Sequence, residues 1–142
     1  MSYSSYRLND DYCSQWYICN FEYDDTTYTS LEQWMLASKA ACIRDHVSLQ
    51  RIMNANNINS LINAGKYIKN ANDSKWNRIR YQMAVHGNYL KFSQNLYLCN
   101  WLLNTGNCNL IEQSTTDRLW GSRNENILGN SIIDVRNQLR NE

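Results

Sequence analysis

The segment EQSTTDRLWG at residues 112–121 holds an acid, a cation and a large flat aromatic ring, namely Asp117, Arg118 and Trp120, within four consecutive positions. Functional side chains concentrate on connecting segments, so this cluster is typical of a ligand site. Arg118 suits a phosphate, which a guanidinium can bind bidentately. Trp120 suits a nucleobase, on which stacking contributes roughly 1–3 kcal/mol. The sequence predicts that the segment closes a pocket for a nucleotide-like ligand; the alternative is a turn stabilised by an ion pair of Asp117 and Arg118.

Three upstream residues are the expected partners of this segment. Ser30 is a predicted N-cap, so Glu32 falls in the first helical turn, where the helix dipole favours an ionised carboxylate. Lys39 follows seven residues later, about 700° around the axis, and therefore points to nearly the same face about 10 Å further along. Trp76 opens the apolar stripe of a later helix. The alternatives are a simple first-turn acid, a lysine that extends to water, and a core tryptophan.

Composition narrows the class of protein. The chain has 142 residues and a net charge of +1, which argues against a binder that holds nucleic acid mainly through its phosphates. No apolar run approaches the roughly 18 residues of a membrane span, and residues 1–12 do not read as a signal peptide, so we expect a cytoplasmic protein. Five cysteines without a CxxC motif, and two histidines outside metal-type spacing, favour free thiols and predict neither a metal nor a cofactor.

Periodicity and turn residues predict the elements that position these side chains. A hairpin is expected around residues 18–21 and 26–28, with its turn at 24–25. Helices are expected from Ser30 (in a capping box with Gln33) to about Ile43, from Asp45 through Met53, from Asn57 to a C-cap at Gly65, from Asp73 as the longest, from Asn95 to Gly106, and from Asn126 through Leu139, with a short extended stretch at 110–112. The predicted fold is mainly α: an irregular orthogonal bundle of about six helices with a small N-terminal β-hairpin, in a single domain over 1–142.

The order and spacing of seven segments resemble the NADAR family, also called YbiA-like. The segments are SQWY at 14–17, YTSLEQWMLASKA at 28–40, WNRIRYQM at 76–83, NYLKFSQN at 88–95, LLNTG at 102–106, LIEQSTTDRLWG at 110–121 and NILGNSIIDVR at 126–136. Each segment alone is a modest signal, but together they cover nearly the whole chain. The resemblance implies a mainly α fold and an N-glycosidase activity.

The resemblance also assigns functional residues by position. The family's catalytic Glu and motif Lys fall on Glu32 and Lys39, and its motif Trp falls on Trp76. Its D-R-x-W-G motif falls on Asp117, Arg118, Trp120 and Gly121, followed by the retained Asn126. We therefore expect Glu32, Lys39 and Asp117 to be catalytic, and Trp76, Arg118, Trp120, Gly121 and Asn126 to bind substrate.

Two departures from the family pattern bear on substrate choice. Gln15 stands where the family commonly has Asn. The family's longer loop, which ends in Trp-x-Gly-x-Asn, is reduced here to SRNE at 122–125, so that its Trp and Gly are missing. A shorter loop implies a more open pocket, or one that another group closes.

The resemblance implies two substrates, and the short loop leaves room for a third function. The first substrate is ADP-ribose attached to guanine in DNA or RNA, in functional pairing with an ADP-ribosyltransferase toxin. The second is a phosphoribosylamino-pyrimidine intermediate of riboflavin synthesis. The third function is a non-catalytic module that binds ADP-ribose or NAD. For the reaction itself, a carboxylate that stabilises an oxocarbenium-like state and a Schiff base formed by Lys39 both remain open.

Overall fold

The protein is mainly α, as the sequence predicts, in a computed structural model that describes residues 5–7, 12–69, 73–111 and 126–142. The helices are α1 (Leu31–Cys42), α2 (His46–Asn54), α3 (Ile58–Lys66), α4 (Ser74–Gln94), α5 (Leu96–Asn104) and α6 (Ile127–Arg140), and the strands are β1 (Ser5–Arg7), β2 (Phe21–Tyr23), β3 (Thr26–Tyr28) and β4 (Asn109–Ile111). Among the described helices, none combines the length and the hydropathy that a bilayer crossing requires.

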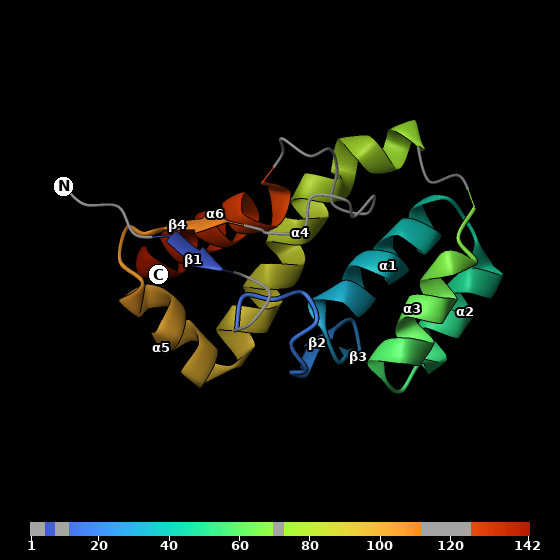
Figure 1. Ribbon diagram of the computed structural model, residues 1–142, viewed down its shortest axis with the longest axis horizontal. Coiled ribbons are helices and arrows are strands. Elements are labelled where there is room, and N and C mark those ends of the chain that lie inside the picture. The colour runs from blue at the N-terminus through green and yellow to red at the C-terminus, as the bar shows by residue number, and fades with distance from the viewer. Residues whose placement is uncertain (1–4, 8–11, 70–72, 112–125) are drawn as a thin grey trace.

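Helix α4 runs through the middle of the molecule and separates two groups of elements (Figure 1). On one side α1 packs against α4, and α2 and α3 continue outward from α1. On the other side α6 and α5 pack against α4, and β4 lies along α6. The buried face of α4 includes Trp76, Ala84, Gly87 and Phe92, so the core extends along the whole helix.

Short polar side chains begin four of the helices where the sequence predicts them. The side chains of Ser30, Asp45, Asn57 and Asp73 each accept a hydrogen bond from the backbone N–H three residues later, at 2.8–3.1 Å. Each satisfies one of the amides that a helix start leaves without a partner, so these local signals are reliable.

The capping box expected at the start of α1 differs in detail. The Gln33 side-chain oxygen accepts from the backbone N–H of Thr29 at 2.9 Å, one residue before the N-cap. Its amide nitrogen donates at the same time to the Ile52 carbonyl of α2 at 3.1 Å, which gives this side chain a tertiary role. The reciprocal capping box predicted for Ser30 lies instead at the start of α3, between Asn57 and Ser60.

The predicted hairpin is present, but its first strand begins later than expected. Asp24 and Asp25 have φ angles of 51° and 61°, as a two-residue turn that matches strand twist requires. This turn pairs Tyr23 with Thr26 and Phe21 with Tyr28. Because Ser30 already caps α1, the second strand stops at Tyr28, so Ile18 lies before the hairpin.

One strand pairing was not predicted, and one prediction from a local pattern needs correction. The parallel pairing of β1 with β4, in the register Tyr6 opposite Leu110, joins segments from the two ends of the chain and has no local signal. Gly65 does not end α3, which continues to Lys66 with its C-cap at Tyr67. A Cβ at position 65 would lie 3.2 Å from both Cδ atoms of Leu36, so this glycine lets α3 approach α1.

Gly87 permits the contact between α1 and α4, and its substitution should destabilise the fold. A Cβ there would lie 2.3 Å from Trp34 Cδ1, and the indole is held by a 2.9 Å hydrogen bond from its Nε1 to the Met83 carbonyl. We expect Gly87→Ala to lower the unfolding free energy by about 2 kcal/mol in urea denaturation, because overpacking outweighs the gain in helix propensity. Gly65→Ala is the matched control, with a change within about 1 kcal/mol since Leu36 can rotate away. Equal effects of the two variants would contradict the account.

Candidate active site

Glu32 lies in the first turn of α1 and is only 4% exposed. Its backbone N–H donates to the carbonyl of Gln15 at 2.9 Å, which ties the start of α1 to the segment before the hairpin. It is the one buried carboxylate among the described residues. Burial of a carboxylate is costly, and its place at a helix N-terminus offsets part of that cost.

Lys39 lies on the same helix and is 5% exposed. Seven residues place it two turns from Glu32 on nearly the same face of α1, as the spacing predicts. A lysine that extended its ammonium group into water would be much more exposed, so its burial favours a role inside the protein. Helix α1 therefore holds an acid and a potential nucleophile or cation, both shielded from bulk water.

Trp76 occupies the first turn of α4 and is fully buried. Its backbone N–H is bound by the Asp73 cap at 2.9 Å. Its indole Nε1, by contrast, has no hydrogen-bond partner among the described residues. A buried donor of this kind is uncommon in proteins and is available to a substrate acceptor or to a residue outside the described ranges.

Asn126 begins α6, as predicted, but its side chain does not cap that helix. Its Nδ2 donates instead to the carbonyl of Leu110 at 2.7 Å, so it joins the start of α6 to β4. Gly129 allows the two to approach, because a Cβ there would lie 2.0 Å from the same carbonyl oxygen. The predicted site residues Asp117, Arg118, Trp120 and Gly121 belong to the connection between β4 and α6 and lie outside the described residues.

A hollow of about 490 Å³ is lined by residues of α1 and α4 together with the hairpin. Its wall includes Trp34, Ala37 and Ser38 of α1 and Ile79 and Met83 of α4, but none of Glu32, Lys39 and Trp76. Glu32, Lys39 and Trp76 therefore do not line this hollow.

Buried charge reveals one functional candidate, Lys91, that the sequence did not predict. Lys39, Lys91 and Arg136 are the buried cations of the described chain. Lys91 lies one turn beyond Gly87 on the buried stripe that also holds Trp76 and Ala84. A lysine at an apolar position of a helix is the sequence signal that could have indicated its burial. Arg136 has a structural role, since it donates to Thr105 Oγ1 at the C-cap of α5 and to the Cys108 carbonyl just before β4.

Metal-binding groups do not assemble in the part of the chain that the structure describes. No cluster of three or more His, Cys, Asp or Glu side chains occurs among these residues. All five cysteines are free thiols, as the sequence predicts.

The fold and these residues define a small α-helical domain with a buried acid and lysine on one helix. The fold matches the NMR structure of the E. coli protein YbiA with a TM-score of 0.80 and 22% identity, over 99% of this chain and 87% of that chain. The NADAR domain model matches residues 3–140, and the chain belongs to the NADAR family.

A curated relative is N-glycosidase R617 of Acanthamoeba polyphaga mimivirus, which is 36% identical over 113 residues. The match covers 76% of this chain and 66% of the relative, so the chain spans just under two thirds of that protein's length.

Proposed function

We propose that the protein is an N-glycosidase, a hydrolase that cleaves the bond between ADP-ribose and guanine in nucleic acid. The observation that carries the proposal is the burial of Glu32 and Lys39 on one face of α1, at the family's motif positions. The mimivirus relative, an N-glycosidase, supports the reaction class. We further propose that the protein acts in the cytoplasm on strands modified by an ADP-ribosyltransferase.

The proposed reaction passes through a state with oxocarbenium character at C1 of the ribose. Glu32, as a carboxylate beside that carbon, stabilises the positive charge and orients water. Water adds its hydroxyl to C1, and its proton goes to the guanine nitrogen, so that ADP-ribose and unmodified guanine are the products. Asp117 is the second carboxylate assigned to this step.

Binding is assigned to the remaining motif residues. Trp120 and Trp76 form the proposed apolar slot for the base, and the Nε1 of Trp76 is a buried donor without a hydrogen-bond partner among the described residues. Arg118 is assigned to the diphosphate, with Gly121 and Asn126 beside it. The net charge of +1 suits an enzyme that recognises the ADP-ribose group more than the strand.

Release of ADP-ribose tests the proposal. The purified protein is incubated with an oligonucleotide that carries ADP-ribosylated guanine, and free ADP-ribose is measured; Asp117→Asn is the inactive control. We expect release by the wild type and a loss of about a hundredfold or more in the variant. Binding of ADP-ribose in calorimetry without release would instead indicate a non-catalytic module. Cleavage of phosphoribosylamino-pyrimidines alone would indicate the metabolite enzyme.

A further inference from the structure

Lys91 is a buried lysine at a position where helix α4 presents an otherwise largely apolar face. Its exposed fraction is 0%, and it follows Gly87 and Asn88 on the buried side of α4. Burial of an ammonium group is unfavourable unless its surroundings compensate for the lost water. An apolar residue would fill the same space without that cost, so the buried charge indicates a specific role for Lys91.

The surroundings of Lys91 hold its ammonium group in place. Its Nζ donates to the carbonyl of Ser14 at 3.1 Å and lies 5.6 Å from the centroid of the Tyr17 ring and 5.1 Å from that of Phe92. A hydrogen bond to Tyr97 is the main cause that raises the pKa of Tyr17 to about 12. Burial raises the pKa of the Cys19 thiol, although the charge of Lys91 opposes this. Tyr17 and Cys19 are therefore neutral near pH 7.

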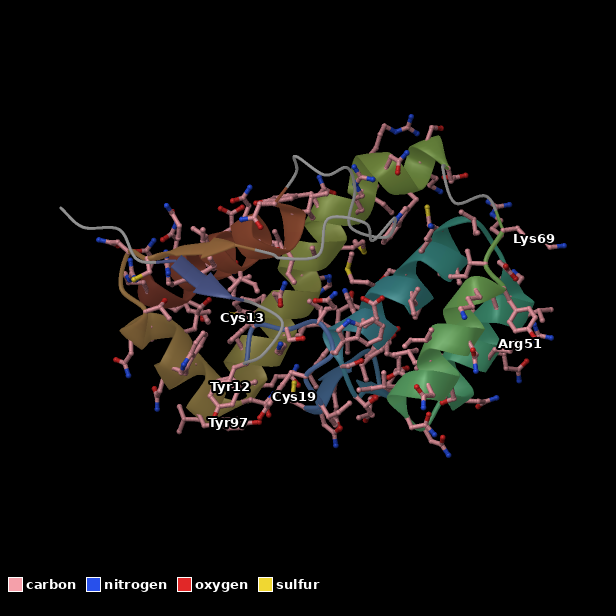
Figure 2. The ribbon with its side chains drawn as sticks, in the orientation of Figure 1. Tyr12, Cys13, Cys19, Arg51, Lys69 and Tyr97 are labelled. Carbon is pink, nitrogen blue, oxygen red and sulfur yellow. The ribbon has the colours of Figure 1, made fainter. Side chains whose placement is uncertain are left out.

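Figure 2 shows Tyr12 and Tyr97 next to each other, with Cys19 to their right. The Tyr12 ring contacts the rings of Tyr17 and Tyr97 edge to face, at centroid distances of 5.2 and 5.7 Å. This aromatic packing limits the movement of the segment before the hairpin on the side that carries Tyr17.

The turn that Lys91 binds is also the turn that binds the start of α1. Ser14 accepts from the backbone N–H of Trp16 through its hydroxyl and of Tyr17 through its carbonyl. The next carbonyl, that of Gln15, accepts the backbone N–H of Glu32 at 2.9 Å. Lys91 and Glu32 therefore hold the carbonyls of two consecutive residues in a buried turn.

We propose that Lys91 is a positioning residue for Glu32, and that it acts by fixing the turn at residues 14–17 to which the Glu32 amide is bound. The inference rests on the proposed function, in which Glu32 is catalytic. An error of about 1 Å in a catalytic group can cost up to a hundredfold in rate, so a clamp on this turn affects turnover more than substrate binding. The burial of Ser14 and Gln15, at 4% and 5% exposed, keeps water from competing for these bonds.

Lys91→Met removes the clamp, and Lys91→Arg restores a charged donor at the same position. We expect Lys91→Met to lower kcat by about tenfold to a hundredfold with KM changed less than about threefold, and Lys91→Arg to recover much of the loss. Gln94→Met is the matched control, because Gln94 also joins α4 to the N-terminal segment, at the backbone of Glu22. Its kcat should match that of the wild type.

Hydrogen exchange gives a second measurement that needs no substrate. The Glu32 amide should exchange at least about tenfold faster in Lys91→Met, while the Ser48 amide, bound to Asp45, serves as an unchanged reference. A wild-type exchange rate at Glu32, or a kcat within about threefold of the wild type, would overturn the inference. If the wild-type protein shows no turnover, the proposed function is wrong. The exchange rate of the Glu32 amide then still tests whether Lys91 fixes the turn. If Lys91→Met does not fold, Lys91→Gln takes its place in both measurements.

Discussion

Glu32→Gln should abolish turnover while the protein remains folded. The substitution keeps the size and shape of a buried side chain but removes the negative charge that the proposed mechanism places beside the ribose carbon. A general base or charge-stabilising group contributes on the order of a hundredfold to ten-thousandfold, so we expect kcat to fall about a thousandfold. Single-turnover measurement of ADP-ribose release gives the rate, and circular dichroism verifies the helical content.

Glu22→Gln is the matched control for this experiment. Glu22 is an exposed carboxylate of β2, and its side chain accepts a hydrogen bond from Thr27 Oγ1 at 3.5 Å. Its substitution should leave kcat unchanged. A Glu32→Gln rate within tenfold of the wild type would remove Glu32 from the mechanism and transfer the chemistry to Lys39 or Asp117.

Gly129→Ala should give the largest loss of stability of the substitutions considered. The added Cβ would lie 2.0 Å from the Leu110 carbonyl oxygen and 2.4 Å from the Asn126 amide nitrogen, and these two atoms already form a 2.7 Å hydrogen bond. Because the nearest atom belongs to the backbone, α6 must move away from β4. We expect a loss of about 3 kcal/mol in the unfolding free energy, measured in urea.

The same substitution should also lower turnover, since β4 and α6 flank the segment 112–125 in the sequence. Asn130→Ala is the control, as Asn130 is exposed on the same turn of α6 and should have little effect on stability. If Gly129→Ala is as stable as Asn130→Ala, the close approach of α6 to β4 is not a feature of the protein in solution.

Local chemistry made much of this fold predictable from the sequence. Ser30, Asp45, Asn57 and Asp73 mark helix starts because their side chains bond to amides only three residues away. The seven-residue spacing of Glu32 and Lys39 was enough to place both on one face of α1, where the structure finds both buried.

Non-local contacts account for what the sequence did not predict. The register of β1 with β4 depends on segments about a hundred residues apart. Gly65 is needed for the close approach of Leu36 in α1 and does not mark the end of α3. Nothing in the sequence around Lys91 marks it as a functional residue. Its burial and its hydrogen bond to the Ser14 carbonyl identify it in the structure. The positions of Asp117, Arg118, Trp120 and Gly121 remain predictions.

Intact-mass spectrometry of a guanine-ADP-ribosylated oligonucleotide after reaction tests the central claim most directly, because each possible bond cleavage leaves a different product. We predict that the strand returns to its unmodified mass while intact ADP-ribose appears in solution, which requires cleavage between ribose and guanine. A strand that keeps a ribose phosphate would mean that the diphosphate was cleaved. A strand with an abasic site would mean that the modified base was removed from deoxyribose, and either result would contradict the account.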